Sequence, residues 1–281
     1  MKKIMILILG LMTFVSVTLI LGCVKANTVN TSLYPCVTEV NASGNSLAQF
    51  LNALSVESLW AKNHYVNWET GALLSGEGSP WATDSETHCS GFVGFVAARL
   101  NIPLLHAPFP SSPYSSIFKN SYGVNFPDLS ASSDSLLATK QGEWLKNHAV
   151  TVLPSTPFTQ DSVNDWVAVD AYTAQKYANL GYLAVVVYES ATPSSPGHIA
   201  VIAPYQNGRQ LGNYSGGNTV YQSFVVDGPY EAQSGGFNSS YTTISLGFAP
   251  PNGSSKQWFG LNSPYNLVSF YLYFKPISFS N

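Results

Sequence analysis

The sequence predicts an α+β fold in which N-terminal helices pack on a mostly antiparallel β-sheet. Residues 46–63, "SLAQFLNALSVESLWAKN", place apolar side chains near helical spacing. A second apolar helix follows Cys89, and β-branched or aromatic runs of strand length occur later, between residues 183 and 274. Helices followed by a run of strands are typical of an α+β domain.

The first elements lead up to the helix that follows Cys89. Residues 27–45 are short polar residues without a sustained period, which predicts a linker. The apolar face of the helix after Cys89 is formed by Phe92, Val93, Val96 and Leu100. The triplet "NIP" ends this helix. Gly91 and Gly94 lower its intrinsic helix propensity, so we expect a packing reason for them.

The later elements are a long loop, a short helix and a set of strands. Residues 107–135 are rich in Pro and Ser and predict a loop insertion, for which a flap over a site is the expected role. Residues 173–182 predict a helix capped by Gly181. Strands are expected at "LAVVVYE" (183–189), "HIAVIAPY" (198–205), "VYQSFVVD" (220–227) and "LVSFYLYF" (267–274).

Residues 1–26 have the features of an export signal, with Lys2 and Lys3 before the apolar run "IMILILGLMTFVSVTLILG". Three fates fit this segment. Ala26 can close a small-residue cleavage site, "ILGC" is similar to a lipobox that would lipidate Cys23, and the run is nearly long enough for an uncleaved anchor. We therefore expect a protein that is secreted or held in the cell envelope, touching a membrane only through this segment. Residues 46–281 are expected to form a single domain.

Composition excludes several classes of function. Only 10% of the 281 residues are charged, against about 25% in typical globular proteins. Hydrophobic residues reach 45%, so the low charge does not indicate disorder. The net charge of −3 provides no basic stripe for nucleic acid. Because the sequence has no short-spaced metal-ligand cluster and no phosphate-cradling glycine motif, we expect neither a metal nor an organic cofactor.

Cys89 is the candidate nucleophile. A cysteine in the first turn of a helix faces the positive end of the peptide dipoles, which favours the thiolate by at most about 2 kcal/mol. This lowers the pKa of a thiol only part of the way, so a neighbouring imidazolium is also required. The alternative is structural: after signal removal Cys36 and Cys89 remain, in a compartment that permits a disulfide between them.

Among the five histidines, His198 is the best candidate for the general base. It begins a predicted strand after Gly197, which permits close approach of the backbone. The strand period places on one face His198, Ala200 and Ile202. The alternative is an exposed histidine at a strand edge. His88 adjoins the thiol in sequence, but successive residues entering a helix point in different directions. The other three, expected at the surface, are His64, His106 and His148.

At these residues the chain resembles papain-like peptidoglycan hydrolases of the NlpC/P60 and CHAP type. "HCSGFVGFVAARLNIPL" (88–104) is similar to their nucleophile helix, and "GHIAVIAP" (197–204) to their histidine strand. A closer likeness is to the type VI secretion amidase effectors, which cleave the γ-D-glutamyl-diaminopimelate bond of peptide stems. Blocks similar to theirs follow in the same order in "AQKYANLGYLAVVV", "AQSGG" and "LVSFYLYF". The likeness spans about residues 80–274 as scattered blocks.

The resemblance implies a papain-like fold and a set of roles. Cys89 would be the nucleophile and His198 the general base and acid. An amide N–H at the helix start, from Cys89 or Ser90, would stabilise the oxyanion. Two features differ from the family pattern: the thiol and the imidazole are far apart in sequence, with the 107–135 loop between them, and the chain carries its own export signal.

In the resembled enzymes the residue that orients the imidazole lies on the strand after the histidine strand. Here "VYQSFVVDGPYEAQSGG" (220–236) offers Asp227, Gln233 and Glu231. Asp227 is the first choice because an anion at hydrogen-bond range holds a cationic imidazole best. Its alternative role is that of a turn residue, since Asp-Gly is a strong turn signal. Gln233 is the second candidate, as a residue that orients the histidine or binds substrate.

The expected function is that of an exported cysteine amidase, or endopeptidase, that hydrolyses peptidoglycan stem peptides through a Cys-His acyl-enzyme. The γ-D-glutamyl-diaminopimelate bond is the expected one, and the resemblance leaves room for an inhibitor or immunity protein as a further partner. A protease or transpeptidase on the same scaffold is a variant of this hypothesis. The alternative is a non-catalytic secreted protein for cell-wall binding or adhesion, with a Cys36–Cys89 bridge; the low charge and the 13% of aromatic residues favour it.

Overall fold

The structure is a computed structural model that describes residues 37–60, 64, 66–68, 70–73, 89–106, 137–151, 166–191, 197–212, 218–221, 224–235, 237–248, 267–277 and 279. These residues all belong to one compact unit, Val37–Asn281. The predicted signal segment, the predicted flap at 107–135, His88 and the cysteines Cys23 and Cys36 lie outside the described residues.

The described helices include the three that the sequence predicts, with shifted bounds, and three that it does not predict. They are α1 (Ala42–Ala53), α2 (Cys89–Arg99), α4 (Ala138–His148), α5 (Ala171–Asn179), α6 (Phe224–Asp227) and α7 (Ile244–Gly247). Helix α1 begins inside the predicted linker because the side chain of Asn41 caps it, accepting a hydrogen bond of 2.7 Å from the N–H of Gly44. The helix predicted over 46–63 ends early, before Ser55, whose φ of 52° is left-handed.

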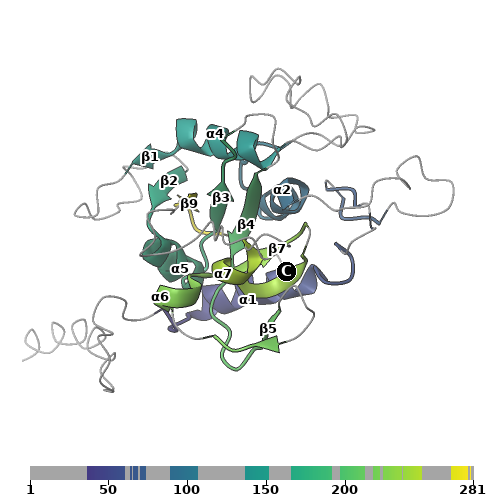
Figure 1. Cartoon of the computed structure of the whole chain (residues 1–281), viewed down its shortest axis with the longest axis vertical. Helices are drawn as coiled ribbons and strands as arrows, with labels where there is room; N and C mark the ends of the chain where they lie inside the picture. Colours follow the sequence, from purple (N-terminus) through teal and green to yellow (C-terminus); the bar gives the residue numbers. More distant parts are fainter. Residues whose placement is uncertain are drawn as a thin grey trace, which may run out of the picture. The chain divides into compact units, whose positions relative to one another are not determined.

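The strands form one large sheet and one small one (Figure 1). The large sheet has the order β1-β2-β9-β3-β4-β7-β8, and its pairs are antiparallel except for β1 with β2. Its strands are β1 (Val150–Thr151), β2 (Trp166–Val169), β3 (Ala184–Tyr188), β4 (His198–Ile202), β7 (Tyr230–Gln233), β8 (Ser239–Thr243) and β9 (Val268–Tyr273). Because β1 has two residues, six strands form the body of the sheet. The small sheet pairs β5 (Leu211–Gly212) with β6 (Asn218–Thr219). The α+β class with a mostly antiparallel sheet is therefore confirmed.

Three of the four predicted strands are present, as β3, β4 and β9. The fourth prediction, a strand over 220–227, is wrong, because its second half is the short helix α6. Gly228, with a φ of 76°, donates from its N–H to the carbonyl of Phe224 at 3.0 Å and ends that helix. The strand that follows is β7, so Asp227 closes a helix and not a strand.

The helices pack closely on the sheet. Helix α2 packs against β4, α4 against β3 and β4, and α5 against β3 and β9 (Figure 1). The main core cluster joins α2 to the sheet through Phe92, Val93, Val185, Val187, Ile199 and Val201. A Cβ on Gly94 would lie 2.9 Å from the Cβ of His106, which confirms the expected packing reason for this glycine. His106 is buried in this contact, so its predicted surface position is wrong.

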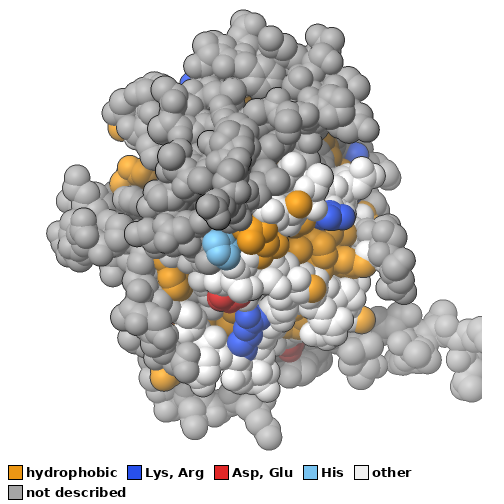
Figure 2. Space-filling view, turned by 90° about the vertical axis from the view of Figure 1, so that its right-hand side faces the viewer, with side chains coloured by type: hydrophobic (Ala, Val, Ile, Leu, Met, Phe, Trp, Pro, Cys, Tyr) orange, Lys and Arg blue, Asp and Glu red, His pale blue; other side chains and the backbone are white. Residues whose placement is uncertain are grey.

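The surface reflects the low charge of the chain. Figure 2 shows one face on which hydrophobic and uncharged polar side chains cover most of the described area, with few charged groups among them. No helix within the described ranges has the length and apolar character needed to cross a bilayer.

Candidate active site

Cys89 is the first residue of α2 and carries a free, half-buried thiol. Cys89 therefore takes no part in a disulfide bond in this structure. Because the first N–H groups of a helix have no partner within it, backbone donors gather at this end of α2. The N–H groups of Ser90 and Ile199 hydrogen-bond with Cys89 and favour its thiolate form.

His198 begins β4 and hydrogen-bonds through its side chain with Cys89. The preceding Gly197 has a φ of 63°, and a Cβ on it would lie 2.5 Å from the carbonyl oxygen of Tyr188. Only glycine fits this close approach of β4 to the end of β3. The packing of α2 against β4 then brings the thiol and the imidazole together across a long stretch of sequence.

The two groups change each other's pKa. Burial alone would raise the pKa of the Cys89 thiol, but the positive charge and the hydrogen bond of His198 outweigh this effect, so the pKa is lowered. Burial alone would lower the pKa of His198, but the negative charge of the Cys89 thiolate outweighs it and raises that pKa to about 9. At neutral pH the arrangement therefore favours a thiolate-imidazolium pair.

Gln233 is the hydrogen-bond partner of the second ring nitrogen of His198. Nε2 of His198 donates a hydrogen bond of 2.6 Å to Oε1 of Gln233. Since Nε2 is engaged in this way, Nδ1 is the ring nitrogen that remains for the thiol. The ring of Phe248 packs edge-on against the imidazole, with the centroids 4.5 Å apart. The imidazole is thus held by a hydrogen bond and by an aromatic contact.

Asp227, the first candidate for orienting the imidazole, does not lie beside His198. The register of β4 with β7 pairs Val201 with Ala232 and, continued along both strands, brings Gly235 opposite His198. Asp227 comes before β7 begins, toward the opposite end of this strand pair. There its carboxylate accepts a hydrogen bond of 3.5 Å from the hydroxyl of Ser245. The geometry therefore favours Gln233 over Asp227 as the group that orients the imidazole.

Glu231, the third candidate in this segment, lies on β7 two residues before Gln233. It is fully buried, and neither carboxyl oxygen has a hydrogen-bond partner within the described part of the chain. A Cβ on Gly247 would lie 1.7 Å from Oε1 of Glu231, so the absence of a side chain at Gly247 leaves room for this carboxyl group. Burial raises the pKa of Glu231 to about 8, while the positive charge of His198 acts in the opposite direction.

Gln141 is a supporting residue that sequence reasoning missed. It is fully buried in α4, and its Nε2 donates to the carbonyl oxygens of Ser90 at 3.1 Å and Leu105 at 2.9 Å. These bonds fix the backbone immediately after Cys89. A glutamine in a helix usually faces solvent, so the sequence gives no signal that Gln141 supports the backbone after Cys89.

The described residues contain no group of three or more His, Cys, Asp or Glu side chains placed to hold a metal ion. The chemistry that the arrangement supports uses a nucleophilic sulfur, a proton-carrying imidazole and backbone N–H donors at the start of a helix. No protein-family model matches the chain, and a comparison with curated proteins finds no significant match.

Proposed function

We propose that the chain is an exported cysteine amidase that hydrolyses an amide bond in the peptide stems of peptidoglycan. The observation that carries this proposal is the hydrogen-bonded pair of Cys89 and His198, with Gln233 on the far nitrogen of the imidazole. A nucleophile, a base in contact with it and a third group that orients the base are the parts that acyl transfer requires.

In the acylation step, the Sγ of Cys89 attacks the carbonyl carbon of the scissile amide. The carbonyl oxygen gains a negative charge, which the N–H of Cys89 at the start of α2 is placed to stabilise, as a donor with no partner within the helix. The Ser90 N–H, which bonds with the sulfur in the resting site, lies beside the same reacting centre. His198 gives its proton to the leaving nitrogen, the C–N bond breaks, and a thioester and a free amine result.

In the deacylation step, the neutral His198 removes a proton from a water molecule, and the resulting hydroxide attacks the thioester carbonyl. The C–S bond breaks, the carboxylic acid leaves, and the thiolate-imidazolium pair is restored. Gln233 accepts a hydrogen bond from Nε2 in both steps and so keeps Nδ1 directed at the sulfur. A neutral amide can do this without forming an ion pair with His198 that would lower its acidity.

The choice of substrate rests on the sequence. The motifs around Cys89 and His198 resemble those of amidases that cut the γ-D-glutamyl-diaminopimelate bond, which makes this the first bond to test. The export signal would carry the enzyme to the compartment where peptidoglycan lies. A net charge of −3 gives no reason to expect nucleic acid as the substrate.

The test is mass spectrometry of the fragments released from diaminopimelate-type peptidoglycan by the purified mature chain. Cys89→Ala and Cys89→Ser are run beside it. We expect new stem fragments only from the unaltered chain. If the γ-D-glutamyl bond is cut, the amino group of diaminopimelate that this bond had acylated is newly free. Equal release by Cys89→Ala would contradict the proposed nucleophile, and intact wall in every reaction would contradict the proposed substrate.

A further inference from the structure

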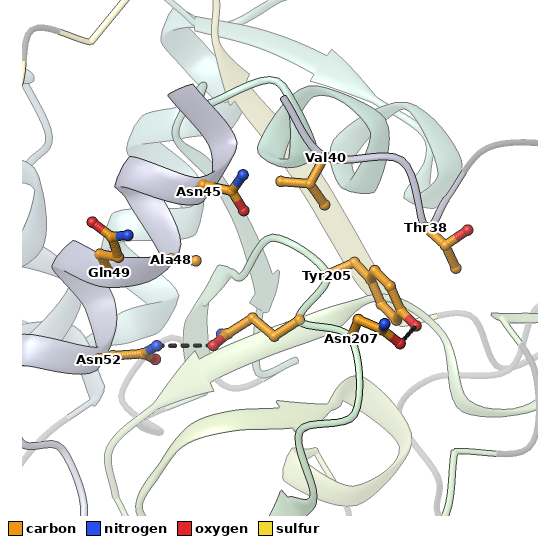
Figure 3. A pocket seen from close by; sticks show the side chains of 9 residues that line it. Thr38, Val40, Asn45, Ala48, Gln49, Asn52, Tyr205 and Asn207 are labelled. Atoms are coloured by element: carbon orange, nitrogen blue, oxygen red, sulfur yellow. Dashed lines mark hydrogen bonds between the residues drawn. The ribbon is translucent and has the colours of Figure 1, made fainter. Parts of the chain in front are cut away.

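A pocket of about 330 Å³ opens between α1 and the segment that follows β4 (Figure 3). It is lined by Thr38, Val40, Asn45, Ala48, Gln49, Asn52, Tyr205, Gln206 and Asn207. Its volume is at the lower end of the range for small-ligand sites, roughly 300–1,000 Å³. None of the nine lining side chains carries a charge, and most of them are amides or hydroxyls.

The α1 wall presents a row of amides. Asn45, Gln49 and Asn52 follow the i, i+4, i+7 spacing that places side chains on one face of a helix, and all three are exposed. The side chains of Asn45 and Gln49 make no hydrogen bond within the described part of the chain. Both amides are therefore available to a ligand without breaking a contact of the fold.

The opposite wall contains a buried donor without an acceptor. The Oε1 of Gln206 accepts hydrogen bonds from Asn52 Nδ2 at 2.8 Å and from Arg209 Nη1 at 2.9 Å. Because only the oxygen can accept from two such donors, Nε2 is the atom left over. This nitrogen is buried and has no partner among the described residues. A buried donor left unsatisfied costs about 1–3 kcal/mol, and this cost is relieved if the amide turns toward the pocket and meets an acceptor on a ligand.

The pocket also offers aromatic and small apolar surface. The hydroxyl of Tyr205 donates to Oδ1 of Asn207 at 3.1 Å, which holds the ring at the rim of the pocket (Figure 3). Val40 and Ala48 supply apolar contacts between the amides. A flat aromatic ring, neutral amides and methyl-sized apolar contacts together match a sugar ring that carries an acetamido group.

This pocket is separate from the site at Cys89. His198 begins β4 and Tyr205 follows its end, and a strand rises about 3.3 Å per residue. The two ends of this segment are therefore about 20 Å apart. A polymer that reaches both places could be held at one and cut at the other.

We propose that the pocket between α1 and Tyr205–Asn207 binds one neutral, N-acetylated sugar unit of a glycan. The amides of Asn45 and Gln49 bond with its hydroxyl and acetamido groups, and Tyr205 contacts the ring. Gln206 Nε2 donates to one of its oxygens once its amide turns toward the pocket. The identification of this glycan as the one to which the peptide stems are attached rests on the proposed function. The pocket would then hold the glycan while Cys89 acts on a stem.

The test measures binding of the trisaccharide of N-acetylglucosamine to the unaltered mature chain, by calorimetry and by the side-chain amide signals in a ¹H-¹⁵N spectrum. The glucose trisaccharide, which lacks acetamido groups, is the control probe. The double variant Asn45→Ala/Gln49→Ala removes two exposed amides. Asn147→Ala, an exposed asparagine of α4 far from the lining residues in sequence, is the matched control. Thermal unfolding shows whether each variant is folded.

We expect saturable binding of the N-acetylated probe, weaker binding of the glucose probe, and about tenfold or greater loss of affinity in the double variant. Asn147→Ala should bind like the unaltered chain. Absence of saturable binding, equal binding of both probes, or unchanged affinity in the folded double variant would overturn the proposal. Neither probe contains a stem amide, so a chain that binds the trisaccharide but releases no stem fragments would refute the proposed function alone. A chain that cleaves stems but does not bind would refute the pocket alone.

Discussion

Cys89 and His198 are each half-buried, and each makes the charged form of the other more favourable. Desolvation acts against both charges, and the contact between them more than compensates for it. The pair therefore depends on both partners. Removing either one leaves the other in a half-buried setting where its neutral form is favoured.

The first prediction concerns the thiol reactivity of Cys89 as a function of pH. Because the pKa of Cys89 is lowered by His198, alkylation by iodoacetamide should reach its plateau below the pH at which an ordinary thiol does so. In His198→Ala the burial remains and the positive charge is lost. We expect alkylation at pH 7 to slow by about tenfold or more, since one pKa unit changes the thiolate fraction tenfold.

His148→Ala, on the exposed end of α4, is the control and should react like the unaltered chain. The proposed amidase activity should fall as the pH rises through about 9, because His198 then loses the proton that the leaving amine needs. An unreactive Cys89 thiol in the unreduced mature chain would contradict the pair and would favour a disulfide to Cys36.

The second prediction separates Gln233 from Asp227. Gln233→Ala removes the acceptor at Nε2 of His198, so the imidazole can rotate away from the sulfur. Loss of this orientation should reduce kcat/KM by about 100-fold with little change in KM. Asp227→Asn should reduce it by less than about threefold, because Asp227 lies toward the other end of the strand pair and bonds Ser245.

Retention of activity in Gln233→Ala, together with its loss in a folded Asp227→Asn, would reverse this assignment. Gln233→Asn is a further check, because its shorter side chain keeps the chemical group but moves it back from Nε2. Partial activity is expected there, between that of Gln233→Ala and that of the unaltered chain.

At the scale of elements, the approach of β4 to β3 and α4 sets the position of His198. A Cβ on Gly197 would lie 2.5 Å from the carbonyl oxygen of Tyr188 and 2.6 Å from the hydroxyl of Thr139 in α4. Real Cβ atoms do not approach backbone oxygens this closely, so any side chain at Gly197 must push β4 away. The imidazole would move with it.

The third prediction compares Gly197→Ala with Gly208→Ala. Both glycines have positive φ, of 63° and 74°, so each alanine costs about 1–2 kcal/mol of backbone strain. A Cβ on Gly208 would meet nothing within 4 Å, whereas Gly197→Ala adds overpacking of about 1–3 kcal/mol. We expect a lower midpoint of thermal unfolding for Gly197→Ala and a large loss of activity at temperatures where it is still folded. Equal stability and equal activity of the two variants would contradict the close packing at Gly197.

Elements with strong local signals could be predicted from the sequence, and the others could not. The β3, β4 and β9 segments are rich in β-branched or aromatic residues, and α2 has apolar residues at helical spacing. Strand β8, "SSYTT", is polar yet buried, because its hydroxyls find partners, as Thr242 does with the carbonyl of Gly212 at 2.8 Å. Helix α4 contains Gly142, which sits where a Cβ would meet Val187 at 2.8 Å. Tertiary contacts, which local propensity does not express, determine both elements.

In the candidate site too, the residues with a strong local signal could be predicted and the others could not. Cys89 and His198 each stand beside a local signal, a helix start and a glycine before a strand, and they are in contact in the structure. The choice between Asp227 and Gln233 depended on where β7 begins and how it pairs with β4. A run that ends in valines and Asp-Gly fits a strand end as well as it fits the helix α6, so the sequence did not determine this register.

At the scale of the whole molecule, the stability should depend on pH through Glu231. Burial raises the pKa of this carboxyl group from the usual range to about 8 in the folded chain. The folded state therefore holds the proton of Glu231 more tightly than the unfolded state does. The contribution to stability is fully present below about pH 4.5 and is lost as the pH rises through about 8.

The fourth prediction is that Glu231→Gln reduces this dependence. The amide cannot ionise, so the variant should lose less stability than the unaltered chain between pH 5 and pH 9, by a few kcal/mol, measured as the free energy of unfolding in urea at each pH. Glu143→Gln, which removes a partly exposed carboxylate paired with Lys140 at 2.9 Å, is the control and should change little. A parallel pH dependence in Glu231→Gln and the unaltered chain would show that Glu231 reaches solvent or a partner once the protein is in solution. If the prediction holds, this buried carboxyl group sets an upper pH limit for the fold. Because the negative charge of Glu231 is also one of the causes that raise the pKa of His198, Glu231→Gln should at the same time lower the pH at which the proposed amidase activity falls.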